Sequence, residues 1–204
     1  MITTSRSLPP LPVCSITCLS NPSNLALPIV ADTAADTCGR SPSKAACLAV
    51  FEAAESYQNN PDANIVDILR LIHANWLVKI SPYSSTDCSA TCLFAIQSEV
   101  IITLGRLGDG MIVALGETDK KHLILSDNKQ DSFSNYTNSL QQEFRADHWE
   151  TAVIETTAYN AVVLCTDGIS DDLLPEKKMI FTQELYSTYA NMEKKKKKRD
   201  LRRW

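Results

Sequence analysis

One apolar run late in the chain constrains the fold more than any other stretch. Residues 161–164 are all apolar and Cys165 follows them, a pattern typical of a strand that is buried on both faces of a sheet. The run ends at Thr166, Asp167 and Gly168. A carboxylate at the end of a buried strand, followed by a glycine that permits a tight turn, suits the binding of a hard cation. The alternative is that Asp167 and Gly168 only form the turn by which the chain leaves the strand.

Composition indicates an ordinary soluble globular protein. The 204 residues are 44% hydrophobic and 22% charged, which is enough for one domain with a sizeable core. The net charge of −4 provides no general basic field for nucleic acid. No apolar run approaches the roughly 20 residues of a membrane span, and the N-terminus lacks the pattern of a signal peptide. We therefore expect neither nucleic acid nor a membrane as a partner.

The seven cysteines are odd in number and include no C-x-x-C pair. Cys14 with Cys18, and Cys88 with Cys92, are spaced C-x-x-x-C, but neither pair has histidines at zinc-binding spacing, so zinc is the weaker alternative. Cys92 and Cys165 stand within apolar runs and are interpreted as small buried hydrophobic residues. Reduced thiols of this kind indicate a cytoplasmic location.

The local patterns predict helices first and strands afterwards. Residues 1–27 are rich in proline and small polar residues, which predicts an irregular N-terminal arm. Apolar residues at three- and four-residue intervals predict helices over 41–57 and 64–79. His73 lies off the apolar stripe of the second helix, so we expect it at the surface.

Strands are predicted before and after these helices. Their expected ranges are 25–31, 90–97, 100–107, 111–115, 121–125, 151–156 and 161–164. Gly108-Asp109-Gly110 is predicted as the tight connection of a hairpin. Two helices followed by antiparallel strands fit an α+β fold in which helices cover sheets. A further helix is expected from residue 175 to about 191, before the basic run at 194–199, which we interpret as a solvated tail rather than a nucleic-acid patch.

Three segments form an ordered set of motifs. Val30-Ala31-Asp32 resembles a V-A-D-G motif, and residues 87–109 resemble an apolar strand followed by a V-G-D-S turn. Residues 162–174 resemble an apolar strand followed by S/T-D-G-apolar-x-D-x-L, and residues 134–137 are similar to a Y-A-N-x-T stretch. These motifs, in this order, resemble those of the PPM-type (type 2C) metal-dependent protein serine/threonine phosphatases, in a bacterial-like branch. Three ordered motifs are far more specific than one.

The resemblance implies a fold and an activity. The expected fold is an αββα sandwich of antiparallel sheets covered by helices, incomplete at the C-terminus. The phosphatase-like domain would span residues 28–190, between the irregular arm at 1–27 and a basic C-terminal tail at 191–204. The implied reaction is hydrolysis of phosphoserine and phosphothreonine in proteins. Two Mn²⁺ or Mg²⁺ ions would share a bridging water and lower its pKa, so that hydroxide forms near neutral pH.

The resemblance also assigns roles to individual residues. Asp32 matches the metal-binding aspartate of the first motif, and Thr33 occupies the position whose backbone carbonyl would be a second ligand. Asp167 matches the later metal aspartate, and Gly168 its turn. Asp109 matches the aspartate of the V-G-D-S turn, whose role is structural. No catalytic residue beyond the metal site is assigned.

The chain also departs from the family pattern. Thr33 replaces the usual glycine, and no D-G-H-G-G continuation follows Asp32. Residues 1–27 contain no acidic residue, and the final D-N or D-D motif is absent. Three hypotheses follow: an active phosphatase, a catalytically inactive relative that binds a phosphorylated protein or another partner, and an unrelated α+β interaction domain.

Overall fold

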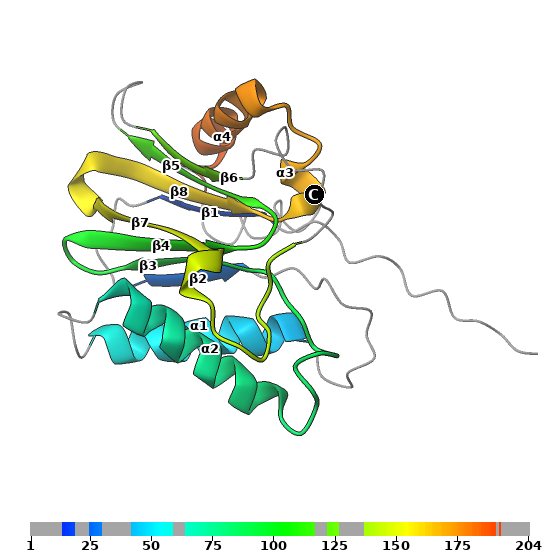
Figure 1. Ribbon diagram of the computed structural model, residues 1–204. Helices are drawn as coiled ribbons and strands as arrows, with labels where there is room; N and C mark the ends of the chain where they lie inside the picture. Colours follow the sequence, from blue (N-terminus) through cyan, green and yellow to red (C-terminus); the bar gives the residue numbers. More distant parts are fainter. Residues whose placement is uncertain are drawn as a thin grey trace, which may run out of the picture.

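Two antiparallel sheets form the centre of the computed structural model (Figure 1). The structure describes residues 14–18, 25–29, 42–58, 64–116, 122–126, 137–190 and 192, with the backbone alone for the first two segments. The strands are β1 (Cys14–Cys18), β2 (Leu25–Ile29), β3 (Cys92–Gln97), β4 (Ile101–Leu107), β5 (Met111–Gly116), β6 (Leu123–Ser126), β7 (Trp149–Glu155) and β8 (Tyr159–Cys165). Within the described ranges, sheet A has the order β1-β8-β5-β6 and sheet B the order β2-β3-β4-β7.

Helices cover the outer faces of both sheets. They are α1 (Pro42–Gln58), α2 (Ile65–Ile80), α3 (Asp167–Ser170) and α4 (Pro175–Tyr189), with short 3-10 helices η1 (Ala146–His148) and η2 (Thr156–Ala158). The pair α1 and α2 packs on sheet B, and α4 packs on sheet A (Figure 1). The predicted α+β sandwich of antiparallel sheets between helices is therefore confirmed.

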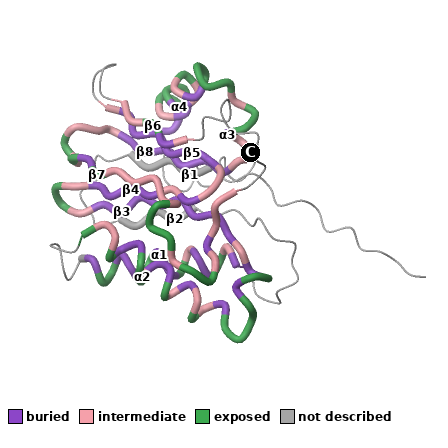
Figure 2. The backbone as a smooth tube through the Cα atoms, in the orientation of Figure 1, coloured by how far each residue is buried: buried purple, intermediate pink, exposed green. Residues whose placement is uncertain are grey.

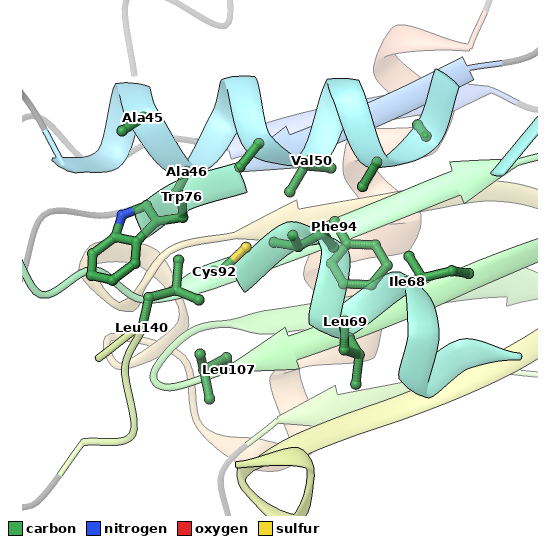
Figure 3. Close-up of a cluster of buried hydrophobic side chains, with 14 of the residues drawn as sticks. Ala45, Ala46, Val50, Ile68, Leu69, Trp76, Cys92, Phe94, Leu107 and Leu140 are labelled. Atoms are coloured by element: carbon green, nitrogen blue, oxygen red, sulfur yellow. The ribbon is translucent and has the colours of Figure 1, made fainter. Parts of the chain in front are cut away.

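The core consists of three apolar layers. The helices and strands that form these layers contain the segments coloured as buried in Figure 2. Between the helices and sheet B, the small side chains Ala46, Ala49 and Ala53 of α1 are fully buried and allow the helix to approach its neighbours closely. Trp76 of α2 and Phe94 of β3 belong to the same layer (Figure 3). A second layer lies between the two sheets, and a third between sheet A and α4.

The helix α2 forms where its apolar periodicity predicts. Asn64 caps its N-terminus, because the side-chain oxygen accepts a hydrogen bond of 3.2 Å from the backbone N–H of Asp67. The prediction that His73 lies at the surface is wrong, since this residue is only 8% exposed. His73 follows Leu69 by four residues and precedes Trp76 by three, so it lies beside the same apolar stripe.

The prediction of an irregular arm over residues 1–27 is wrong for β1, which pairs with β8 along its whole length. The prolines of this region flank the strand, and β8 supplies a continuous row of backbone partners on that side. Pro28 is the fourth residue of β2. This position is compatible with a strand because β2 is at the edge of sheet B, where one row of N–H groups needs no partner.

The connection at Gly108-Asp109-Gly110 differs from the predicted hairpin. It joins β4 in sheet B to β5 in sheet A, so the chain crosses from one layer to the other at this turn. Both strands are buried along nearly their whole length. The sequence of β5 is continuously apolar, and that of β4 is mostly apolar without a strict alternation, so the pattern does not indicate which sheet each strand joins.

The other predicted strands and helices are confirmed within a few residues. The expected basic tail at 191–204 lies outside the described residues, apart from Met192. Among the helices in the described ranges, none has the length and hydropathy required to cross a membrane.

Candidate metal centre

Asp167 follows β8, a central and largely buried strand of sheet A. The five residues 161–165 are all buried, because β8 has β1 on one side and β5 on the other. Thr166 is also buried, and α3 begins at Asp167, which is half-buried. The carboxylate oxygen Oδ1 of Asp167 accepts a hydrogen bond of 2.8 Å from the backbone N–H of Gly168. A partly solvated carboxylate is thus held at the end of a rigid strand.

Gly168 does not form the tight turn that was predicted from the sequence. It is the second residue of the short helix α3, and within the described residues only Gly108 and Gly110 have a positive φ. The chain therefore leaves β8 directly into a helical turn. The backbone N–H of Gly168 nevertheless contributes to the site, because it orients the carboxylate of Asp167.

The turn between the sheets lies directly against the end of β8. Gly110 has a φ of 109°, and a Cβ atom there would lie 2.7 Å from the carbonyl oxygen of Cys165. A glycine is required at this position for both its backbone conformation and its lack of a side chain. Gly110 thus brings the turn into contact with a residue two positions before Asp167.

Polar contacts fix the conformation of this turn. The hydroxyl of Thr137 donates a hydrogen bond of 2.7 Å to Oδ2 of Asp109. Nη1 of Arg106 donates to the carbonyl oxygen of Gly108 at 2.7 Å, and its Nε donates to the Glu150 carboxylate at 2.8 Å. These contacts link the turn to the segment at Thr137 and to β7.

The end of β2 lies at the same end of the sandwich as the end of β8. Ile29, the last residue of β2, pairs with Leu93 of β3. The side chain of Leu93 would lie 3.1 Å from a Cβ atom at Gly110, which also faces the Cys165 carbonyl. Asp32 and Thr33 follow Ile29 by three and four residues, and both lie outside the described residues.

Among the described residues, Asp167 has the chemistry of a ligand for a divalent cation. The carboxylate of Asp167 is a hard oxygen donor, and no ion pair of the described part of the chain involves it. No group of three or more histidine, cysteine or acidic side chains is close enough to hold a metal in the described ranges. A cation at Asp167 therefore requires ligands from elsewhere in the chain, and Asp32 is the predicted one.

The cysteines show no zinc site in the described residues. Cys88, Cys92 and Cys165 are fully buried. Burial raises the pKa of the Cys92 thiol, and the neighbouring Cys47 thiol raises it further. The interpretation of Cys92 and Cys165 as buried hydrophobic residues is thereby supported.

Comparison with known proteins identifies the family. The family model described as protein phosphatase 2C matches residues 18–204. The chain belongs to the protein phosphatase 2C family. This phosphatase 2C match begins within the arm and includes the basic tail that were predicted from composition. No curated protein sequence matches the chain.

Solved phosphatase 2C structures are similar to the chain at low sequence identity, and one of them exceeds a TM-score of 0.5. Serine-threonine phosphatase 2C from Toxoplasma gondii is 12% identical, with a TM-score of 0.54 and 89% of each chain covered. The serine/threonine phosphatase PstP/Ppp from Mycobacterium tuberculosis is 15% identical, with a TM-score of 0.43 and coverage of 80% of this chain and 83% of that one. A structure of the PstP catalytic domain with two manganese ions is 17% identical, with a TM-score of 0.47 and coverage of 82% and 83%.

The turn Gly108-Asp109-Gly110, which joins the two sheets, is called the interlayer turn below. Beside the interlayer turn, the phosphatase 2C domain has a polar pocket of about 620 Å³. Its lining comes from α2, the loop after α2, the end of β4, the segment at 137–145, η1 and the start of β7. The lining residues are His73, Ser85, Thr86, Ser89, Leu107, Thr137, Ser139, Leu140, Gln141, Gln142, Glu143, Phe144, Arg145, His148 and Trp149. Sequence analysis of this phosphatase 2C domain did not predict the pocket. The one signal was the Y-A-N-x-T resemblance at 134–137, which marks the segment that carries Thr137.

Proposed function

We propose that this chain hydrolyses phosphoserine and phosphothreonine in proteins, with a divalent cation, Mn²⁺ or Mg²⁺, bound by Asp32 and Asp167. The observation that carries this proposal is the position of Asp167. Its carboxylate stands at the end of a buried strand, oriented by the N–H of Gly168 and without an ion-pair partner in the described residues. Membership of the protein phosphatase 2C family supports the reaction class.

Several residues of the chain would prepare the site. Asp32 and Asp167 would supply hard carboxylate oxygens, and the backbone carbonyl of Thr33 a further oxygen ligand. The interlayer turn, held by Arg106 and Thr137, would keep the end of β8 in place. A pair of bound cations would supply an activated water and neutralise the phosphoryl oxygens. The proposed substrate is therefore a phosphorylated protein, and the proposed setting is the reducing cytoplasm, since the described cysteines form no disulfide.

A second candidate function is a catalytically inactive domain that binds a phosphorylated protein or another partner. The observation that favours it is the first motif, in which Thr33 follows Asp32 and no histidine occurs in the next residues. A two-cation site with only two carboxylates would also carry too little negative charge to hold both ions firmly.

Turnover of phosphothreonine peptides in the presence of Mn²⁺ tests the proposal. We expect Asp167→Asn to lower the rate by at least about a hundredfold, because removing a ligand should cost more than removing its supporting contacts. Asp67→Asn, a similar change at an exposed position in the first turn of α2, should leave the rate unchanged.

Peptide binding separates the two candidate functions if wild-type protein shows no turnover. Capture of phosphothreonine peptides without their hydrolysis would support the inactive relative. Hydrolysis that is equally fast in wild-type protein and in Asp167→Asn would contradict the proposed metal site. Elemental analysis of the purified wild-type protein and the Asp167→Asn variant shows whether manganese content depends on Asp167.

A further inference from the structure

We propose that the polar pocket beside the interlayer turn binds the peptide residues that flank the phosphorylated side chain of the substrate. This inference rests on the proposed function and extends it, because it assigns a surface that would distinguish a phosphorylated polypeptide from a small phosphate ester. The pocket does not include Asp167 among its lining residues. It would therefore contribute to substrate binding rather than to the chemical step.

The size of the pocket suits an extended peptide segment. Its volume of about 620 Å³ lies within the range of roughly 300–1,000 Å³ that is usual for sites which enclose a ligand. A single phosphate group would leave most of this space empty. Several residues of polypeptide would fill it.

The lining has the chemistry of a surface that binds polypeptide backbone. Uncharged hydroxyl and amide side chains are the largest group in the lining, among them Ser85, Ser89, Ser139 and Gln142. Such groups can donate to carbonyl oxygens and accept from N–H groups, which every peptide unit presents. Phe144 adds an aromatic face for apolar side chains.

The charges of the lining argue against a site for a second phosphate group. Arg145 forms an ion pair of 3.1 Å with Asp147, and both side chains are largely exposed. Glu143 adds a negative charge to the rim of the pocket. Because the guanidinium already has a carboxylate partner, the pocket presents no excess positive charge on Arg145, and a neutral peptide segment fits it better than an anion.

The walls of the pocket are held in place before any ligand binds. Nε2 of His73 donates a hydrogen bond of 2.7 Å to the carbonyl oxygen of Gln141, which fixes the tautomer of this histidine. The ring of Phe144 lies 5.7 Å from that of His73, and the guanidinium of Arg70 lies 5.5 Å from the Phe144 ring. Leu140 pairs with Ala90 through a backbone bridge. A preformed wall lowers the entropic cost of binding a peptide.

The pocket lies at the end of the sandwich where β8 ends, two residues before Asp167. Leu107 and Trp149, which line the pocket, pair with each other at the end of β4 and the start of β7. Thr137, also in the lining, donates its hydroxyl to Asp109, and Gly110 lies against the Cys165 carbonyl. A peptide in the pocket would thus lie beside the turn that contacts the end of β8.

Substrate selectivity tests this inference. Gln142 is exposed at the pocket, so Gln142→Trp should block it and Gln142→Ala should remove one hydrogen-bonding group without disturbing the core. We expect Gln142→Trp to lower the ratio of kcat/KM for phosphothreonine peptides to kcat/KM for p-nitrophenyl phosphate by about tenfold, mainly through KM for the peptide. Gln183→Trp and Gln183→Ala, at an exposed position on α4, are the matched controls and should leave this ratio unchanged.

The outcomes distinguish the pocket from the proposed reaction. An unchanged ratio in both Gln142 variants, or an equal loss toward both substrates, would overturn the pocket assignment while the phosphatase proposal stands. If wild-type protein hydrolyses neither substrate, the proposed reaction fails. Fluorescence anisotropy with a degenerate set of labelled phosphothreonine peptides then tests whether the pocket binds peptide. Peptide binding that Gln142→Trp abolishes, and Gln183→Trp does not, supports the inference. No binding to wild-type protein, or equal binding to both variants, overturns it.

Discussion

Gly110 combines a positive φ with a close contact to the Cys165 carbonyl oxygen, so two separate constraints exclude any side chain there. The position is also where the chain passes between the sheets. The sequence motif indicated a turn around Gly108-Asp109-Gly110. It could not indicate the contact with β8, because that contact joins residues which are more than fifty positions apart along the chain.

The substitution Gly110→Ala should lower the free energy of unfolding by about 1–3 kcal/mol, because a non-glycine residue is strained at this φ. Urea unfolding measures the change. Gly168→Ala is a suitable control, since Gly168 lies in α3 without a positive φ and should tolerate alanine. Equal midpoints for Gly110→Ala and wild-type protein would contradict the proposed strain.

Thr137→Val should cost about 1.5–3 kcal/mol of stability, because it leaves the Asp109 carboxylate without the hydroxyl that donates to it. The side-chain volume is nearly conserved, so the loss reports the hydrogen bond. Thr188→Val, at an exposed position on α4, should change stability by less than about 0.5 kcal/mol. A double-mutant cycle with Asp109→Asn would show no coupling energy if the two side chains do not interact.

Burial raises the pKa of the Cys92 thiol, so the folded protein keeps its proton where an unfolded chain loses it, above about pH 8.5. The stability that the folded protein gains from burying the neutral Cys92 thiol is complete below about pH 8.5 and decreases as the pH rises above that value. At about pH 9, iodoacetamide should label the half-buried Cys47 faster than Cys92 in the folded protein, as measured by peptide mass spectrometry. Equal labelling rates would show that the Cys92 thiol is accessible.

At the scale of secondary structure, local patterns predicted the elements better than their partners. The stripe at Ile65, Ile68, Leu69, Ile72 and Trp76 predicted α2, and all of these side chains except the half-buried Ile65 are buried. The strand β1 was missed because its five residues form a strand through pairing with β8. Pairing between distant segments cannot be predicted from a local sequence pattern. Tertiary contact with Gln141 likewise explains why His73 is buried.

The two faces of α2 should respond differently to truncation. Ile72→Ala should cost about 2–5 kcal/mol, because the side chain is fully buried between the helices and sheet B. Val78→Ala on the same helix should change stability by less than about 0.5 kcal/mol, since Val78 is 75% exposed. Comparable losses in thermal unfolding for the two variants would contradict the orientation of α2 on sheet B.

For the whole molecule, three ordered motifs were enough to predict the family and the sandwich of sheets. The site could be predicted only in part. Asp167 could be proposed because a buried strand leads directly to it, whereas the pocket was missed because its lining comes from several separate segments, the end of β4 among them, without a common spacing. Convergence of distant segments depends on the register of both sheets, and short motifs do not encode that register.

The proposed pairing of Asp32 and Asp167 makes a prediction at this scale. Saturating Mn²⁺ should raise the Tm of wild-type protein by about 5–10 °C, since a ligand that binds only the folded state stabilises it. Asp32→Asn and Asp167→Asn should each abolish most of this shift, and the double variant should lose no more than either one, because both carboxylates would serve one site. Differential scanning calorimetry measures the shifts. Losses that add in the double variant would indicate two independent cation sites.

The passage of the chain from sheet B to sheet A at Gly108-Asp109-Gly110 has a consequence for how the polypeptide could be divided. A cut there would produce two fragments, each contributing strands to both sheets. The first fragment would contain β1, whose sheet partner β8 is in the second, and the second would contain β7, whose partner β4 is in the first. Neither half could complete its own hydrogen-bonded ladders, so the two should assemble only with each other, which makes this turn a natural site for a split reporter.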